Sequence, residues 1–339
     1  MKRMYFVLLG LLLMMASCNQ METVYTAAPQ AIEFASVVHP NTRVPMEGSM
    51  YRHVDSMRVS AYIADAEDAY KDQIGSFFED ILFYKNPAGD GWLGVQFWPL
   101  FSSNINFSLI SQSYKTSNVD VGWGSPAASK AIVRLSNNNV LDQTDLMYGG
   151  GKGITDGKGN YAPVSVLFHH ALSLVSFSFS SMLYEFVTIK KVELVASYNG
   201  TLTVDFDHDN TDAVMNHSTY ATPSWQPDAP QSLTVPNTKY TGACEELLLT
   251  QVESSYGAPL MALPGNGNDR KIVITYNLKQ STASGVNEDK EYVHTHTVAE
   301  EWLPGKKYHY AIQLSPQALL VMPTMETWPT AVKNSVVHN

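Results

Sequence analysis

Cysteine is scarce in this sequence. Only Cys18 and Cys244 occur among 339 residues. Cys18 lies directly after an N-terminal apolar run typical of an export signal, outside the expected fold, so Cys244 has no expected partner within the fold. This arithmetic excludes a structural disulfide. We therefore expect the stability of the fold to come from packing.

Charged residues are also few, and positive charge is the scarcer sign. Charged side chains make up 16% of the chain, with 22 Lys and Arg against 32 Asp and Glu and a formal net charge of -10. The acidic balance argues against nucleic acid or anionic lipid as a partner. Ser, Thr, Asn, Tyr and Val are plentiful, and this composition suits strands and loops better than amphipathic helices. We predict an all-β fold.

Long apolar runs are absent beyond the N-terminus. No stretch after Met15 reaches the roughly eighteen apolar residues that a membrane-spanning helix needs. At the N-terminus, Lys2 and Arg3 precede an apolar run, Met4 to Met15, which is too short to span a bilayer and is typical of an export signal. We predict a signal peptide at residues 1–17.

The export signal ends in a short motif around a cysteine. Met15-Ala16-Ser17-Cys18 places small residues directly before the cysteine and resembles the lipobox of bacterial lipoproteins. The resemblance implies cleavage before Cys18 and lipidation of this residue. The mature chain is then attached to a membrane through lipid and does not span it. The alternative is an ordinary signal peptide followed by an incidental cysteine.

Short β-type segments separated by turn residues follow residues 18–30, which are polar and which we interpret as a flexible tether. Apolar alternation and β-branched or aromatic residues predict strands at Ala31–Val38, Met57–Ile63, Ile81–Tyr84, Trp92–Phe97, Ile105–Ile110, Ala131–Leu135, Val164–Phe179, Val187–Ala196, Thr201–Phe206, Leu247–Val252, Pro259–Leu263, Lys271–Leu278, Tyr292–Val298, Tyr308–Leu314 and Ala318–Met322. An exposed loop, His39–Gly48, is expected after the first of them. Regular short strands of this kind are typical of a sandwich or a barrel.

Three segments carry more specific expectations. Ala64–Ile81 is acidic and tolerant of helix, so we expect a short helix or a long surface connection there. Val164–Phe179 is the longest β-type run and is predicted to be a central strand of a second domain. Asn199-Gly200 separates two alternating segments and predicts a hairpin turn.

A glycine-rich segment divides the chain near its middle. Gly149–Asn160 contains six glycines, a composition that favours a linker. A chain of this length is expected to hold about two domains. We predict an N-terminal domain at 31–158, a C-terminal domain at 159–325 and a tail at 326–339.

Catalytic motifs are weak in this sequence. The segment from Gly153 to Gly159 has the wrong spacing for a phosphate-binding loop and lacks Ser or Thr after Lys158. No serine lies in a nucleophile-elbow pattern, and Cys244 has no neighbouring histidine motif. We expect neither an enzyme nor a cofactor.

Two groups of residues resemble metal ligands. Asp205, Asp207 and Asp209 have the spacing that opens a calcium loop, but the glycine and glutamate required at its sixth and twelfth positions are missing. His294 and His296 share one face of a predicted strand and need a third ligand to bind a metal. We interpret both groups as solvated surface residues and expect no metal site.

A series of short landmarks occurs in a characteristic order along nearly the whole mature chain. They are the lipobox at Cys18, Ile32-Glu33-Phe34 leading to Thr42-Arg43, Arg58-Val59-Ser60-Ala61-Tyr62, Phe97-Trp98-Pro99 with Ile105-Asn106-Phe107, Gln143-Thr144-Asp145-Leu146-Met147, Phe168-His169-His170-Ala171-Leu172, Pro259-Leu260-Met261, and Trp302-Leu303-Pro304-Gly305 before Tyr308–Leu314. In this order they resemble the fimbrillin family of Bacteroidetes, the lipoprotein precursors of a pilus assembled at the cell surface.

The resemblance implies two tandem transthyretin-like β-sandwich domains and assembly by strand exchange. In that scheme a protease cuts after an arginine, the first strand leaves, and a neighbouring subunit's terminal strand fills the groove. The matching arginine is Arg43. Loss of Ala31–Arg43 leaves an open edge and an apolar groove, which another strand satisfies by β-augmentation. The alternative is that Arg43 is an ordinary loop residue and the first strand stays in place, as in anchor subunits.

The sequence thus predicts a structural subunit of a bacterial surface fimbria, a lipoprotein of the outer membrane and cell surface. Its expected partners are other pilus subunits, the membrane and a ligand on a host or bacterial surface. Stalk, tip and anchor positions stay open, and Ala318–Met322 and Ala331–Asn339 either complete the chain's own sandwich or are donated to a neighbour. The competing hypothesis is a surface glycan-binding lipoprotein, because the six tryptophans offer faces for stacking on sugars.

Overall fold

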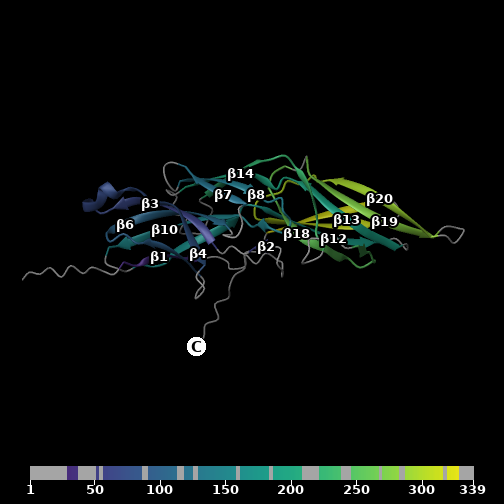
Figure 1. The fold of residues 1–339 in the computed structure, drawn as a ribbon, viewed down its shortest axis with the longest axis horizontal. Coiled ribbons are helices and arrows are strands. Elements are labelled where there is room, and N and C mark those ends of the chain that lie inside the picture. The colour runs from purple at the N-terminus through teal and green to yellow at the C-terminus, as the bar shows by residue number, and fades with distance from the viewer. Residues whose placement is uncertain are drawn as a thin grey trace, which may run out of the picture.

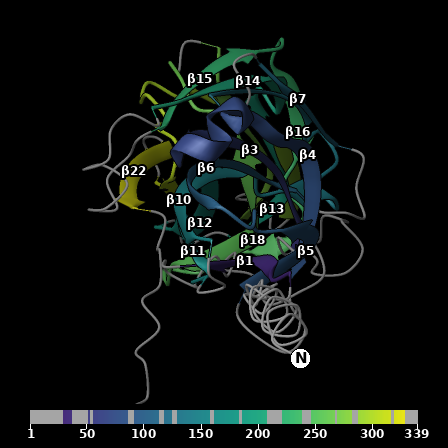
Figure 2. The ribbon, with the colours of Figure 1, turned by 90° about the vertical axis from the view of Figure 1, so that its left-hand side faces the viewer.

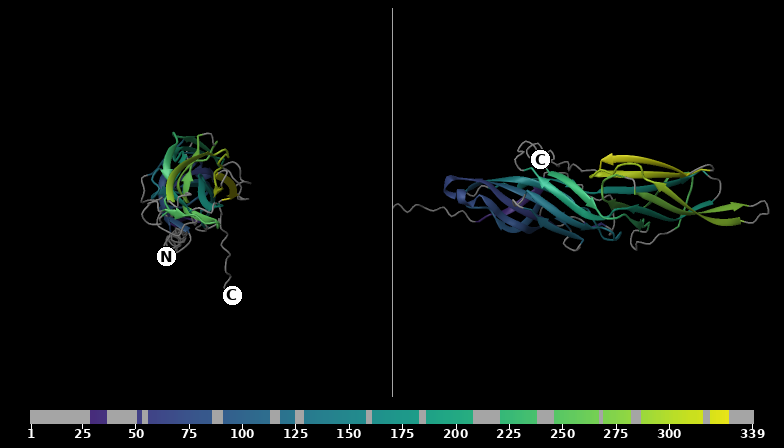
Figure 3. Two further views of the ribbon diagram at one scale, coloured as in Figure 1. Left: turned by 90° about the vertical axis from the view of Figure 1, so that its right-hand side faces the viewer. Right: turned by 90° about the horizontal axis from the view of Figure 1, so that it is seen from above.

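The molecule is elongated and built almost entirely of β-strands. The computed structural model describes residues 29–36, 51–52, 56–85, 91–112, 118–124, 129–157, 161–182, 186–207, 221–237, 246–266, 269–281, 287–315 and 319–327. Earlier strands lie at one end of the long axis and later strands at the other (Figures 1 and 3). Within these residues the helical structure is η1, the 3-10 helix Asp68–Gln73, and no helix is long and apolar enough to cross a membrane. The predicted all-β class is confirmed.

Seven strands form a sheet that closes on itself, called here the closed sheet (Figure 2). In order around the ring they are β1 (Ala31–Ser36), β11 (Val164–His170), β10 (Met147–Asp156), β6 (Ser102–Gln112), β3 (Ser56–Ala66), β4 (Gly75–Lys85) and β5 (Gly91–Phe97). Alternate residues of each strand face the interior, because successive side chains point to opposite sides of a strand. On β3, for example, Met57, Val59 and Ala61 are fully buried.

The other end of the molecule is a sandwich of two sheets, called here the sandwich. One sheet has the order β18 (Ser254–Ala262), β12 (Ser173–Ser181), β21 (Lys306–Leu314) and β22 (Leu319–Thr327). The other has the order β16 (Gln231–Thr234), β13 (Phe186–Ala196), β19 (Lys271–Ser281) and β20 (Asn287–Thr297), with β17 (Leu247–Leu248) also paired to β13. Both sheets contribute to one core, as Phe177 and Ile189 illustrate.

A middle sheet lies alongside these two parts (Figure 1). Its order is β15 (Ala221–Pro227), β14 (Asn199–Phe206), β8 (Lys130–Ser136) and β7 (Val119–Trp123), and a short parallel pair joins β2 (Tyr51–Arg52) to β9 (Gln143–Thr144). Val133 of the middle sheet shares a core with Tyr148 of the closed sheet and Met261 of the sandwich. The middle sheet therefore packs against both ends of the molecule.

Residues 149–156 of the glycine-rich segment belong to a strand, so this part of the segment is not a linker. It forms β10, which pairs with β6 on one side and β11 on the other. Sheets cross the predicted boundary, since β1 pairs with β11 and β8 pairs with β14. The expected domains, 31–158 and 159–325, therefore do not end where the sheets end. The division of the chain into two domains stays a prediction.

Close packing explains the glycines of β10. A Cβ atom on Gly151 would lie 2.6 Å from the carbonyl oxygen of Ser165, and one on Gly153 would lie 2.5 Å from the ring of Trp98. Any side chain would collide at these positions, so glycine is needed for neighbouring groups to approach. Composition alone does not separate such a glycine from one in a linker.

The longest β-type run is two strands, and the prediction of one central strand is wrong. β11 belongs to the closed sheet, whereas β12 belongs to the sandwich. Between them, the N–H of Ala171 donates to the carbonyl of Leu146 at 2.8 Å, and the N–H of Gly305 donates to the carbonyl of Leu172 at 2.9 Å. Both intervening residues are fully buried, so the apolar pattern continues through the change of sheet.

The hairpin predicted at Asn199-Gly200 is also wrong. These residues begin β14, which pairs with β8 and β15, while β13 pairs with β16, β17 and β19. A Cβ atom on Gly200 would lie 2.7 Å from the Cδ1 atom of Leu263 and 2.8 Å from the carbonyl oxygen of Gln226. Gly200 therefore serves close packing and does not form a tight turn.

Several local predictions agree with the structure. The short helix expected within Ala64–Ile81 is η1, although β3 and β4 extend further towards it than predicted. Lys271–Leu278 and Tyr292–Val298 face each other as the antiparallel strands β19 and β20. Ala131–Leu135 lies within β8, which pairs with β7 in the middle sheet.

Candidate functional site

The first strand completes the closed sheet. β1 pairs in parallel with β11 and antiparallel with β5. Just before it, the carbonyl of Gln30 accepts a hydrogen bond from the N–H of Trp98 at 3.0 Å. A strand of six residues thus has neighbours on both sides, and both come from later in the chain.

Two side chains fix β1 in the core. Ile32 and Phe34 are fully buried. The ring of Phe34 meets the rings of Phe83 and Phe107 edge to face, with centroid distances of 4.9 and 5.2 Å. Burial of each such side chain is worth about 1.5–3 kcal/mol relative to exposure, and edge-to-face aromatic pairs add to this. The strand is therefore bound by its own side chains as well as by its backbone.

The place that β1 occupies is suited to any strand of similar pattern. Its walls are the backbone edges of β5 and β11, and its floor includes Phe83, Phe107 and Val166. An unpaired strand edge is a ready template for another chain, and an added strand obtains affinity from main-chain hydrogen bonds and specificity from pockets for alternate side chains. The position therefore suits an extended strand with apolar residues two apart.

Both residues singled out by the sequence, Cys18 and Arg43, lie outside the described residues. Cys18 precedes β1 and Arg43 follows it along the chain. The strand they flank is described, and its Ile32-Glu33-Phe34 landmark supplies the two buried anchors. Lipidation and processing at these positions therefore stay predictions.

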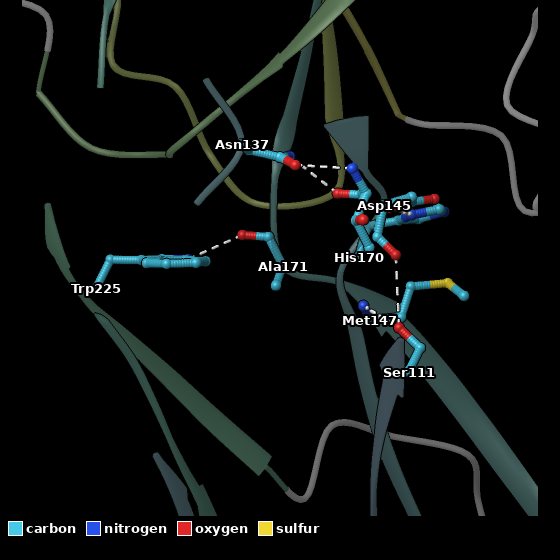
Figure 4. Close-up of polar contacts among 8 residues, drawn as sticks. Ser111, Asn137, Asp145, Met147, His170, Ala171 and Trp225 are labelled. Carbon is cyan, nitrogen blue, oxygen red and sulfur yellow. Dashed lines mark hydrogen bonds and ion pairs between the residues drawn. The ribbon is translucent and has the colours of Figure 1, made fainter. Parts of the chain in front are cut away.

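A buried polar cluster joins the closed sheet to the sandwich (Figure 4). Nδ1 of His170 lies 2.9 Å from Oδ1 of Asp145, and both side chains are buried. The hydroxyl of Ser111 accepts a hydrogen bond from the N–H of Met147 at 2.6 Å. The indole N–H of Trp225 donates to the carbonyl of Ala171 at 2.9 Å. These contacts hold the residues where the chain passes from β11 to β12.

Side-chain amides extend this cluster into the neighbouring sheets. Gln143 donates to the carbonyl of Met261 at 3.0 Å and accepts from its N–H at 2.8 Å. Asn137 likewise accepts from the N–H of Thr144 at 2.7 Å and donates to its carbonyl at 3.0 Å. Two of the landmark segments, Gln143–Met147 and Phe168–Leu172, thus meet here. The sequence offered only their order as a signal, with no local pattern that indicated contact.

The residues considered for metal binding do not converge within the described part of the chain. No group of three His, Cys, Asp or Glu side chains that could hold a metal ion occurs there. Asp205 instead forms an ion pair with Lys130 at 3.2 Å, and Asp209 lies outside the described residues. Burial lowers the pKa of His296. The charge of Glu300 raises this pKa, and the charge of His294 lowers it further.

The described tryptophans are engaged within the fold. Trp302 is fully buried and donates to the hydroxyl of Tyr310 at 2.9 Å. Trp98 stacks on Tyr161 at 5.5 Å, and Trp123 donates to Asp80 at 3.1 Å. A glycan-binding platform needs several exposed aromatics on one face, and these residues do not supply one.

Comparison with known proteins gives the family. A family model described as fimbrillin-like matches residues 96–328, which is more than half of the chain. No curated protein sequence matches this chain. The chain belongs to the fimbrillin-like family, and this membership supports the role of a pilus subunit and points to a structural function.

Solved structures are similar to this chain at low sequence identity, and the first described here shares its fold. A fimbrial protein from Bacteroides vulgatus ATCC 8482 has a TM-score of 0.60 at 14% identity, covering 88% of this chain and 99% of that one. A candidate cell adhesion protein from Bacteroides ovatus ATCC 8483 has a TM-score of 0.49 at 14% identity, covering 89% and 99%. The fimbrial anchor protein Mfa2 from Porphyromonas gingivalis has a TM-score of 0.37 at 10% identity, covering 88% and 98%.

Proposed function

We propose that this protein is a structural subunit of a bacterial surface fimbria that is exported as a lipoprotein and joined to other subunits by exchange of its first strand. Cys18 carries the lipid that attaches the chain to the outer membrane. Cleavage after Arg43 releases β1, and the strand of a neighbouring subunit takes its place. The subunit acts through these contacts and through an adhesion ligand at the cell surface, without catalysis.

One observation carries the proposal. β1 is short, lies near the start of the described fold, and is bound by two edges and two buried side chains, Ile32 and Phe34. Its removal leaves two unpaired strand edges and an exposed aromatic floor, which is costly in water. A replacement strand restores both sets of contacts. Membership of the fimbrillin-like family supports the same reading.

The first experiment is the N-terminus and intact mass of the protein taken from native cell envelopes. A chain that begins at Val44 supports processing and a polymerising subunit. A chain that begins at lipidated Cys18 keeps β1 in place and supports an anchor subunit. An unlipidated start at any other residue contradicts the proposed lipoprotein.

A variant pair tests the processing site. Arg43→Ala removes the basic residue that the protease requires, so the chain is expected to keep β1 and to stay out of fimbriae. Thr42→Ala changes the neighbouring residue and leaves the arginine, so it serves as the control. If Arg43→Ala enters fimbriae as efficiently as Thr42→Ala, cleavage at Arg43 is not the step that permits assembly.

A further inference from the structure

β5, one of the two neighbours of β1, is weakly held by the rest of the closed sheet. On the side away from β1 it pairs with β4 only at Tyr84↔Leu93 and Lys85↔Trp92. On the other side it pairs with β1 from Ala35↔Gly91 to Ala31↔Phe97. Most of the backbone ladder that holds β5 therefore comes from β1.

The side chains of β5 add little to the core. Leu93, Val95 and Phe97 face solvent and are 38, 76 and 50% exposed. On the inward side, Trp92 is half-buried against Phe168 at 5.7 Å. Since apolar burial is the main source of stability, β5 has few anchors of its own.

A direct line of contact links β5 to the buried anchor of β1. Gly94 faces the ring of Phe83, and a Cβ atom there would lie 2.5 Å from that ring. The ring of Phe83 also meets Phe34 edge to face at 4.9 Å. Loss of Phe34 therefore frees the ring against which β5 packs.

The other neighbour of β1 is held independently. β11 pairs with β10 from Gly150↔Leu167 to Met147↔His170, and Val164, Val166 and Phe168 are buried. β11, one wall of the β1 site, therefore stays in place when β1 is lost, whereas β5, the other wall, depends on β1.

We propose that β1 and β5 open as one unit, so that β5 takes its place in the sheet only when a strand occupies the β1 position. The site that accepts a strand is then β11 together with a segment that folds onto the incoming peptide. That peptide must be extended, parallel to β11, with large apolar side chains at two positions two residues apart. The part that concerns a neighbouring subunit rests on the proposed strand exchange.

Native-state hydrogen exchange of the intact, uncut chain tests this coupling. Regions that open together share one opening free energy and respond together to a mutation. Phe34→Leu weakens the packing of β1 against Phe83 and Phe107 and keeps an apolar side chain. We expect amide exchange in β1 and β5 to rise together by about tenfold, a loss of about 1.4 kcal/mol, from one shared opening free energy that lies below that of β6 and β10.

Val133→Ala is the matched control, because Val133 is fully buried in the middle sheet core and does not contact β1. It is expected to leave the exchange of β1 and β5 unchanged. If Phe34→Leu raises exchange in β1 alone, or if β1 and β5 open only at the opening free energy of β6, the proposed unit does not exist. Hydrogen exchange of the uncut chain requires neither lipidation nor cleavage. If the native N-terminus contradicts strand exchange, the exchange data still test whether β1 and β5 open together.

Discussion

Oδ1 of Asp145 lies 2.9 Å from Nδ1 of His170, and the two side chains are only 3 and 4% exposed. Asp145 follows β9 and His170 ends β11, so the contact joins segments on both sides of β10. Directly after His170 the chain leaves the closed sheet for the sandwich. The pair therefore fixes the point at which the chain changes sheet.

Removal of this carboxylate is expected to be costly. Asp145→Ala leaves the buried imidazole without the carboxylate that faces it, and loss of such a buried hydrogen bond lowers the free energy of unfolding by about 1–3 kcal/mol. Urea denaturation followed by tryptophan fluorescence measures the loss. Asp228→Ala is the control, because its partner Arg134 is exposed and surface pairs contribute little. Equal losses in the two variants contradict the role given to the buried pair.

Replacing two strand glycines with alanine tests whether close packing requires a glycine at those positions. Gly151→Ala places a Cβ atom 2.6 Å from the carbonyl oxygen of Ser165, whereas Gly122→Ala finds its nearest neighbour at 3.8 Å. Since the backbone of β11 is held by its ladder, Gly151→Ala is expected to lower the free energy of unfolding by about 1–3 kcal/mol, as overpacking does. Gly122→Ala is expected to be nearly neutral. Thermal unfolding of both variants checks the difference, and a neutral Gly151→Ala refutes the packing argument.

The anchor of β1 is expected to contribute strongly to stability. Phe34→Ala removes a fully buried ring that contacts Phe83 and Phe107, and such changes cost about 3–5 kcal/mol. Val95→Ala, on neighbouring β5, removes a side chain that is 76% exposed and is expected to change stability by less than about 0.5 kcal/mol. Denaturant titrations of the two variants provide the comparison. Similar small losses in both mean that the β1 site is not tightly filled.

Acid is expected to destabilise the fold through His169. Burial, and secondarily the neighbouring His170, lowers the pKa of His169, and its ring stacks on Tyr148 at 5.6 Å. The unfolded chain then takes up a proton near the ordinary histidine pKa of about 6.5 while the folded chain does not. Stability is complete above that pH and falls as pH drops towards the lowered folded pKa, by at most about 1.4 kcal/mol per pH unit.

His169→Phe isolates this contribution. The variant keeps a ring against Tyr148 and removes Nε2, which has no hydrogen-bond partner among the described residues. Free energies of unfolding measured between pH 8 and pH 5 are expected to fall less steeply in the variant than in the parent chain. The difference between the two curves cancels the other histidines, and parallel curves show that His169 does not titrate on unfolding in this range.

Local patterns predicted the parts of the structure that depend on one strand at a time. Partial alternation and β-type residues predicted a strand at Ala31–Val38; β1 is Ala31–Ser36, and its Ile32 and Phe34 are fully buried. The same period identified β19, β20 and β21. These predictions succeed because a half-buried strand needs apolar residues at every second position, whatever its neighbours are.

Local sequence patterns could not predict which strands pair with each other. Gly151, Gly153 and Gly200 lie in segments with the composition of linkers and turns, yet each allows a close approach by a residue distant in sequence. Val164–Phe179 reads as one apolar run, although buried Ala171 and Leu172 carry it from one sheet to another. Similarly, no local signal pairs Asp145 with His170, because each is polar and their contact exists only after the sheets assemble.

By itself the sequence determined that the chain is all-β and that a strand lies near its start, and it predicts an export signal that ends at Cys18. Only the tertiary structure decided that this strand lies between β5 and β11, and that β5 has few other contacts. The physical reason is that the alternation of buried and exposed positions depends on neighbouring residues. Strand order and register, in contrast, are set by the packing of residues far apart in the chain.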